Sequence, residues 1–534
     1  MHRVLSQPYT VDSIKSLNQH IYTKNWPVVY LLENGKEMYV GETGNVQARF
    51  KQHYKREDRR LLTRSHVIID EEYNKSATLD IESWLIQYMA ADGQYTLQNG
   101  NGGLSDHDYF DREKYKAKFD VLWSTLQTMG LAQKDLFELK NTDIFKYSPY
   151  KSLTEEQLTI VHAIKDSLEQ GEQSSHTIQG GPGTGKSVLA SYLVKYLKQD
   201  ENLADMKIGL VVPMTSLRKT FQRVFSKVKG LSASMVLGPN DVIGKQYDLL
   251  IVDEAHRLKR RVNLSGYGPF DKANNLLGLG KTGTQLDWIL RSSKSQIFMY
   301  DKKQSVTPSD VRSSSFATLS AKKYHLTSQL RVMGGNDYIE YVENILTTVP
   351  IEKRSFGKYD LRYFDNIHEL QNEIHVKDKE HGLARLVAGY AWNWQTKKDS
   401  SLDYDINLDG LKLKWNSTMT DWVNSKNAVN EVGCIHTIQG YDLNYVGVII
   451  GPELSYDPVA KKLVVYKDKY LDTNGKRTLE SPEELERYII NIYKTLLTRG
   501  IKGTYIHAVD KDLAIYIKEY FTYHNAKTEN ENEQ

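Results

Sequence analysis

Short apolar runs that end in polar or glycine-rich turns recur along this chain, and they predict alternating strands and helices. Residues 28–32 (VVYLL) and 37–41 (EMYVG) flank the turn sequence ENGK, which predicts a β-hairpin. Residues 77–90 and 188–197 carry apolar side chains at helical spacing. Residues 248–256 (DLLIVDEAH) open with a continuous apolar run, as expected of a parallel strand covered on both faces. The pattern predicts an α/β protein.

At 534 residues the chain is too long for a single hydrophobic core, and we expect several units. The first is a small α+β domain at residues 1–110, followed by a helical linker at 111–150. Two lobes built on parallel sheets follow at 151–332 and 333–522. The polar end of the chain, residues 523–534, is expected to be disordered.

A glycine-rich stretch at 179–187 (QGGPGTGKS) fits the pattern G-x-x-x-x-G-K-[ST] between an expected strand end and an expected helix. In that context backbone N–H groups close around a phosphate, the lysine reaches the outer phosphates, and the serine hydroxyl can bind Mg²⁺. A glycine-rich turn without a ligand is the alternative. The expected nucleotide-binding residues are Gly180, Gly181, Pro182, Gly183, Thr184, Gly185, Lys186 and Ser187.

Two carboxylates end the apolar run at 248–256. Asp253 is expected to lie near Mg²⁺, and Glu254 is expected to orient or deprotonate the water that attacks ATP. Carboxylates that only cap a helix are the alternative. Because the phosphate-binding motif precedes them, hydrolysis of ATP with Mg²⁺ is the expected chemistry.

Five polar residues of the first domain suit phosphodiester cleavage. Arg49 and His53 are four residues apart on an expected helix and share a face. A hairpin tyrosine (Tyr30 or Tyr39), or a water that it orients with His53, would act as general base. Arg49 would hold the phosphate, and Glu82 would bind a divalent metal. Each residue alone also has an ordinary structural explanation.

About one hundred N-terminal residues resemble the GIY-YIG nuclease family. The two signature triplets appear as VVY at 28–30 and YVG at 39–41, which relax the family pattern but keep both tyrosines and the last glycine. Arg49, His53, Glu82 and Asn99 fall where the family has its catalytic arginine, histidine, metal-binding glutamate and late asparagine. The resemblance implies a metal-dependent endonuclease.

The segment from about residue 153 to residue 510 resembles superfamily 1 helicases, most of all the Schlafen-type helicase domain of bacterial proteins. This resemblance implies two RecA-like lobes with ATP between them. It also implies a glutamine that reads adenine, a sensor of the γ-phosphate, and arginine fingers, for which interlobe salt bridges are the alternative. The residues concerned are Gln157, Gln304, Gln439 and Gly440, with Arg331 and Arg499 as the fingers.

A net charge of +3 gives no argument for a nucleic-acid partner, so any argument must be local. Residues 49–64 hold seven arginines and lysines against two acidic residues, which suits contact with phosphates; a salt-bridged surface helix is the alternative. Two segments could determine which substrate is bound. They are the basic residues at 256–265 and the glycine-rich, mobile-looking stretch at 267–283. Four tryptophans at 392–422 could stack on bases, although core packing is favoured.

The chain has one cysteine, Cys434, so no intrachain disulfide can form and a reducing, cytoplasmic location is expected. The first ten residues lack an apolar signal core, and no apolar run approaches the length of a membrane span. We therefore expect no membrane partner.

These features together favour an ATP-driven nucleic-acid translocase or helicase with an N-terminal metal-dependent endonuclease, an architecture that resembles bacterial defence against foreign DNA. DNA is favoured over RNA, and a protein partner or activating signal is compatible with the sequence. Two alternatives stay open. The ATPase could gate the nuclease without unwinding, or the N-terminal domain could be a catalytically dead module that only binds nucleic acid.

Overall fold

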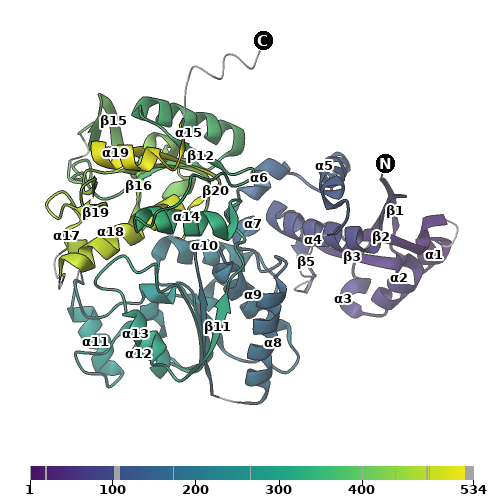
Figure 1. Ribbon diagram of the computed structural model, residues 1–534. Coiled ribbons are helices and arrows are strands. Elements are labelled where there is room, and N and C mark those ends of the chain that lie inside the picture. The colour runs from purple at the N-terminus through teal and green to yellow at the C-terminus, as the bar shows by residue number, and fades with distance from the viewer. Residues whose placement is uncertain are drawn as a thin grey trace, which may run out of the picture. The chain divides into compact units, whose positions relative to one another are not determined.

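The protein is described by a computed structural model that covers residues 2–17, 21–100, 109–171, 173–264, 266–399, 401–438, 440–476, 479 and 481–523 (Figure 1). Contacts divide the chain into two compact units. The first comprises Met1–Gln173, Ser187–Leu210 and Thr220–Val236, and the second comprises Ser174–Lys186, Val211–Lys219 and Leu237–Gln534. Residues 524–534 of the expected disordered tail lie outside the described residues.

In the first unit, five strands of the described chain form a sheet with the order β1-β4-β2-β3-β5. The predicted hairpin is confirmed, because β2 and β3 pair antiparallel with Tyr30 opposite Gly41 and Leu32 opposite Tyr39. Gly35 forms the turn at a φ of 81°, which glycine adopts without strain. The strands are β1 (Arg3–Pro8), β2 (Lys24–Glu33), β3 (Glu37–Asn45), β4 (Arg64–Ile69) and β5 (Thr96–Leu97).

Helices flank this sheet and continue beyond it. The segment expected to be a linker is helical, but its first helix, α5, packs on α4 through Phe119 against Trp84 and Trp123 against Tyr88. Arg112 adds an ion pair to Asp80 at 2.8 Å, so α5 extends the N-terminal domain. The elements are α1 (Val11–Ser16), η2 (Ile21–Thr23), α2 (Val46–Tyr54), α3 (Glu57–Arg60), α4 (Lys75–Asp92), α5 (Arg112–Thr128), α6 (Leu136–Lys140), α7 (Asp143–Tyr147) and α8 (Glu155–Glu169).

A second sheet has the order β11-β6-β10-β9-β7-β8 across the part of the chain that the structure describes. β6, β9, β10 and β11 pair in parallel, as the buried apolar runs predict. Its strands are β6 (Ser175–Gly180), β7 (Ile208–Val211), β8 (Val236–Leu237), β9 (Tyr247–Val252), β10 (Ser293–Tyr300) and β11 (Ala321–Leu326). The helices between them are α9 (Lys186–Gln199), α10 (Thr215–Ser226), η3 (Ala233–Met235), η4 (Pro239–Val242), η5 (Ala255–Arg257), α11 (Gly268–Leu276), α12 (Gln285–Arg291) and α13 (Ser313–Ala317).

A third sheet has the order β14-β15-β16-β13-β17-β20-β12-β21 among the described residues, and all its pairs are parallel except β14 with β15. The strands are β12 (Asp360–Tyr363), β13 (Ala384–Ala388), β14 (Ile406–Leu408), β15 (Leu411–Trp415), β16 (Glu431–Cys434), β17 (Leu443–Ile450), β20 (Gly500–Ala508) and β21 (Thr522–Tyr523), beside the hairpin β18 (Leu454–Asp457) and β19 (Lys462–Val465). The helices are α14 (Gly335–Leu346), α15 (Ile367–His381), η6 (Trp422–Asn424), η7 (Ala428–Asn430), α16 (Ile435–Ile438), α17 (Thr473–Lys476), α18 (Pro482–Leu497) and α19 (Lys511–Lys518).

Two sequence-based expectations are decided here. Residues 267–283 are not a mobile loop: they contain α11, and Asn274 Nδ2 donates to the carbonyl oxygens of Gly280 and Gly283 at 3.1 Å each. Of the four tryptophans expected to pack in the core, Trp415 and Trp422 are buried there, whereas Trp392 and Trp394 are only partly buried and pack against it. In the described part of the chain, no helix is both long and apolar enough to cross a membrane.

Candidate active sites

The glycine-rich loop joins β6 to α9 and is held from outside by residues 329 and 330. Gly183 has a φ of 79°, and a Cβ at this position would lie 2.0 Å from Gln329 Oε1. Gln329 Nε2 donates to Pro182 O at 2.7 Å, and Leu330 N donates to Gly183 O at 2.9 Å. These contacts fix the backbone that carries the expected phosphate-binding amides.

Lys186 is buried, and its ammonium folds back onto its own loop. Nζ donates to Gly180 O at 2.7 Å and to Gly181 O at 2.8 Å. A Cβ at Gly181 would meet no atom within 4 Å, so the backbone there borders open space. A buried lysine beside open glycine backbone fits a phosphate group.

The acidic pair follows β9, and both side chains are buried. Burial alone would raise the pKa of Glu254, but attraction to His256, Lys186 and Arg499 outweighs burial and lowers the pKa of this carboxyl. Glu254 is therefore a carboxylate at neutral pH. The lysine of the glycine-rich loop and one predicted finger both act on it.

His256 connects Glu254 to the loop after β10. The Asp301 N–H donates to His256 Nδ1 at 3.2 Å, which leaves Nε2 of the same ring to face Glu254. That nitrogen lies 3.0 Å from Glu254 Oε2. Asp301 also accepts from Gln304 Nε2 at 2.9 Å, so a series of close polar contacts through His256 and Asp301 links the expected catalytic carboxylate to the expected γ-phosphate sensor.

The two predicted arginine fingers have different surroundings. Arg331 forms an ion pair with Asp442 at 2.9 Å and donates to Thr498 O at 2.8 Å, which is the salt-bridge alternative. Arg499 donates to Tyr441 O at 3.2 Å, and its charge reaches Glu254. The contacts of Arg331 match the salt-bridge alternative, so Arg499 is the favoured candidate for the finger, and both roles stay predictions.

A cavity of about 260 Å³ lies at the carboxyl ends of β6, β10 and β11. Helices α14 and α18 complete its wall. Ligands of parallel sheets bind at this edge, which makes the cavity part of the candidate nucleotide site. It is lined by residues 179–182, 301–304 and 325–327 together with Ile339, Glu343, Lys494 and Thr495.

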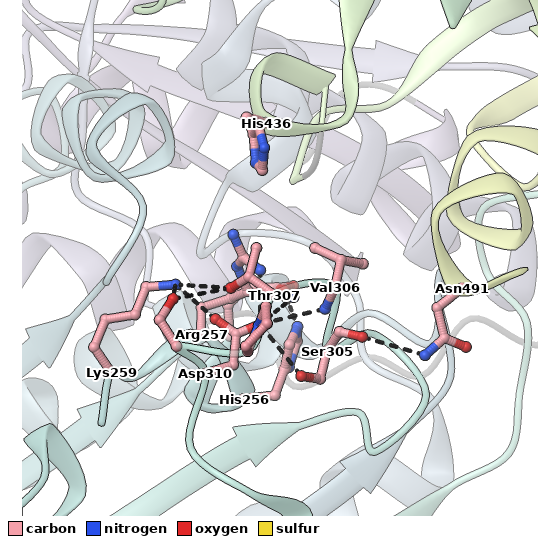
Figure 2. Close-up of polar contacts among 12 residues, drawn as sticks. His256, Arg257, Lys259, Ser305, Val306, Thr307, Asp310, His436 and Asn491 are labelled. Atoms are coloured by element: carbon pink, nitrogen blue, oxygen red, sulfur yellow. Dashed lines mark hydrogen bonds and ion pairs between the residues drawn. The ribbon is translucent and has the colours of Figure 1, made fainter. Parts of the chain in front are cut away.

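Of the four basic residues after the acidic pair, three are held in ion pairs that the sequence does not show, and Arg260 donates to Pro308 O at 2.8 Å. Arg257 and Lys259 both form ion pairs with the buried Asp310, at 2.9 Å and 2.6 Å (Figure 2). Arg261 pairs with Asp271 at 2.6 Å. The sequence shows the cations but not the distant carboxylates, so it overstates the exposed charge.

The last pair of residues implied by the helicase resemblance, Gln439 and Gly440, follows β16 and α16. His436 Nε2, on α16, lies 3.1 Å from Asp472 Oδ2, and Gly440 has a φ of 90°. Ser216 Oγ donates to Met419 O at 2.9 Å, so the segment that begins α10 contacts the loop after β15. Gln439 lies outside the described residues, and its role stays a prediction.

In the N-terminal domain, the hairpin tyrosines and α2 converge. Tyr30 Oη lies 2.7 Å from His53 Nε2, and Arg49 Nε donates to Tyr30 Oη at 3.4 Å. The rings of Tyr39 and His53 are 4.8 Å apart. A Cβ at residue 41 would lie 2.3 Å from Tyr30 Oη, so the glycine of the second triplet makes room for this hydroxyl.

Two pKa shifts give these groups distinct roles. Burial, helped by the charges of Arg49 and Arg59, lowers the pKa of His53 to about 4, so His53 is neutral and can accept a hydrogen bond from the Tyr30 hydroxyl. Burial, together with the nearby Glu42 carboxylate, raises the pKa of Glu82 to about 7. A bound cation would stabilise the ionised form of a carboxyl whose pKa is raised. Glu82 is therefore compatible with the predicted role as a ligand of a divalent metal.

Three residues that the sequence analysis expected to be functional make structural contacts with nearby segments. Asn99 accepts from Val40 N at 3.0 Å and donates to Val40 O at 2.8 Å, which holds the strand that carries Tyr39. Arg59, expected in the basic stripe, is buried and stacks 3.7 Å from the Tyr39 ring centre. Gln157 caps α8, where its Oε1 accepts from Thr154 N at 3.1 Å.

Residues 173–510, more than half of the chain, match the family described as Schlafen group 3, DNA/RNA helicase domain. The chain belongs to this helicase family. The Schlafen group 3 domain therefore contains the glycine-rich loop, the acidic pair and both arginines described above. Its assignment supports a helicase-like ATPase.

One curated relative, the uncharacterized protein YPL245W of Saccharomyces cerevisiae, is 27% identical over 386 residues, which span 63% of this chain and 82% of the relative. The Pif1 helicase from Bacteroides is 12% identical and covers 71% of this chain and 96% of its own, with a TM-score of 0.29. The Pif1 helicase from Candida albicans is 12% identical and covers 71% and 99%, also with a TM-score of 0.29. At that TM-score, neither structure carries an argument.

Sequence reasoning missed two residues of the Schlafen group 3 domain. His256 stands two residues after Glu254, and that position could have indicated a contact with this carboxylate. Asp310 gave no such signal, because it meets Arg257 and Lys259 only after the chain has folded.

The low pKa of His53 can be measured directly. In its fold His53 is expected to titrate near pH 4, about 2.5 units below an exposed histidine. The unfolded chain binds more protons there between those two pKa values, so His53 reduces stability as pH falls through that window. Histidine-selective NMR on wild type and His53→Gln would show a resonance that is lost in the variant. A midpoint near pH 6.5 would contradict the assigned role.

Proposed function

We propose that the chain is an ATP-driven nucleic-acid translocase or helicase whose N-terminal domain is a metal-dependent endonuclease. The observation that supports the ATPase part is the buried Glu254 carboxyl, which lies 3.0 Å from His256 Nε2 and whose pKa is lowered by the charges of His256, Lys186 and Arg499. The nuclease part is supported by the contacts of Tyr30 with His53 and Arg49, near the half-buried Glu82.

The residues of the ATPase site fit Mg²⁺ and ATP by their chemistry. Ser187 and Asp253 would hold Mg²⁺, which offsets negative charge on the phosphates when bound. Lys186 exchanges its loop carbonyls for phosphate oxygens, and Glu254 orients the attacking water. Arg499 supplies positive charge where the phosphoryl group transfers.

In the nuclease site, Tyr30, or a water that it orients together with His53, would act as general base. Arg49 steadies the phosphate, and Glu82 would hold the metal. DNA is the proposed substrate, and the pairing of the two activities resembles bacterial defence against foreign DNA; that role rests on architecture alone.

The test is plasmid cleavage with Mg²⁺, with and without ATP, by wild type, Lys186→Ala and Glu82→Ala. Cleavage that requires Glu82 and that changes with ATP only when Lys186 is present would support the coupled machine. DNA-stimulated ATP hydrolysis without cleavage would leave a motor with a binding domain. ATP-dependent cleavage with no strand displacement in an unwinding assay would favour the gated nuclease.

A further inference from the structure

Asp310 occupies a position that the proposed ATPase mechanism does not use. Its side chain is fully buried and pairs with Arg257 and Lys259, which follow the catalytic carboxylates by a few residues. Burial alone would raise the pKa of Asp310, but those two cations outweigh burial and lower it. The group is therefore a buried anion between the buried Arg257 and the partly exposed Lys259, an arrangement that is costly to disturb.

The same carboxylate shapes the loop at residues 301–310, which we name the sensor loop because it carries Gln304. Asp310 Oδ2 accepts from Ser305 Oγ, Val306 N and Thr307 N, each at 3.3 Å (Figure 2). These bonds close a turn around one oxygen atom. The carbonyl of Ser305 is left outside the turn, where Asn491 Nδ2 donates to it at 3.2 Å.

Asn491 belongs to α18, and a second contact from this helix reaches the sensor loop. Lys494 forms an ion pair with Glu343 at 2.6 Å, and Glu343 also pairs with Lys303 of the loop. Asn491 and Lys494 are three residues apart, so they share a face of the helix. Two residues beyond the end of α18 stands Arg499, the favoured finger.

We propose that Asp310 and Asn491 are positioning residues that join the sensor loop to α18, so that Gln304 and Arg499 respond together when nucleic acid binds. This inference rests on the proposed ATPase function. If Asp310 only stabilised the fold, its ion pairs with Arg257 and Lys259 would be sufficient for that role. Asp310 also holds the turn at residues 305–307, and Asn491 of α18 contacts Ser305 in that turn. Asp310 is therefore linked through Ser305 to the helix that precedes Arg499.

Asn491→Ala removes the link and leaves the ion pairs intact. We expect kcat for ATP hydrolysis with single-stranded DNA to fall at least about fivefold, with KM for ATP and DNA affinity within about twofold of wild type. Asp310→Asn should lower the same kcat further, and the double variant should match Asp310→Asn because the two residues act through one contact. Asp271→Asn, which breaks the Arg261 pair elsewhere, is the matched control and should keep wild-type stimulation.

Wild-type kcat in Asn491→Ala would overturn the proposal, as would full additivity in the double variant or equal loss of stimulation in the control. If Asp310→Asn does not fold, Asn491→Ala and Asn491→Asp decide alone. A wild-type protein that hydrolyses no ATP with or without DNA refutes the proposed ATPase instead. Hydrolysis that Asn491→Ala leaves unchanged refutes only the link.

Discussion

Replacement of Glu254 by Gln is expected to lower the rate of ATP hydrolysis at least about 100-fold while ATP still binds. Glutamine keeps the shape of the side chain and can still accept from His256 Nε2, 3.0 Å from the Glu254 carboxylate. It loses the negative charge that Lys186 and Arg499 stabilise, and with it the group that orients or deprotonates water. Phosphate release measured beside fluorescent-nucleotide binding separates the two effects.

Glu453 offers a matched control in the same unit. It is also buried, its pKa is raised to about 7 by burial, and its Oε1 accepts from Tyr493 at 2.5 Å. Glu453→Gln should therefore change hydrolysis by less than about threefold. Equal losses in both variants would show that any buried glutamate exchange damages the unit, and would remove Glu254 from the mechanism.

Replacement of Arg49 by Ala is expected to reduce Mg²⁺-dependent plasmid cleavage by about 100-fold or more. Arg49 is the arginine that donates to Tyr30, and its charge also helps to hold His53 neutral. Its loss removes the cation proposed to steady the phosphate and shifts the pKa of His53 upward. Single-turnover cleavage at saturating protein measures the chemical step apart from binding.

Arg56 is the control for general charge. It pairs with Asp58 at 3.1 Å and is exposed, so Arg56→Ala removes one cation of the basic stripe without removing a contact of Tyr30, and its charge lowers the pKa of His53 less than that of Arg49 does. We expect weaker DNA binding at low salt and a cleavage rate within about threefold of wild type once DNA is bound. Similar losses in both variants would mean that Arg49 only adds to DNA attraction.

The sequence predicted the elements whose patterns are local. The hairpin with Tyr30 and Tyr39 and the buried strand before Asp253 were both legible, because turn residues and apolar runs act over a few positions. The glycine-rich loop was legible for the same reason. The packing of α5 on α4 was not, because the periodicity of a helix shows that one face is apolar but not what covers it.

Functional assignments were less predictable where a residue's partner lies far away in the sequence. Arg257 and Lys259 read as surface charge until Asp310, about fifty residues later, was found beside them. Arg331 and Arg499 read alike as fingers, and only the ion pair to Asp442 separates them. Asn99 matched a family position, yet its two bonds to Val40 were not visible in any motif.

The backward-folded ammonium of Lys186 has a consequence for turnover. Each arriving nucleotide competes with the carbonyls of Gly180 and Gly181, so part of its binding energy replaces bonds that already exist. After hydrolysis the same carbonyls offer the lysine a partner, which lowers the barrier to departure of the product. In the proposed ATPase, the loop would therefore bind nucleotide less tightly and release product more readily than a loop with a free lysine.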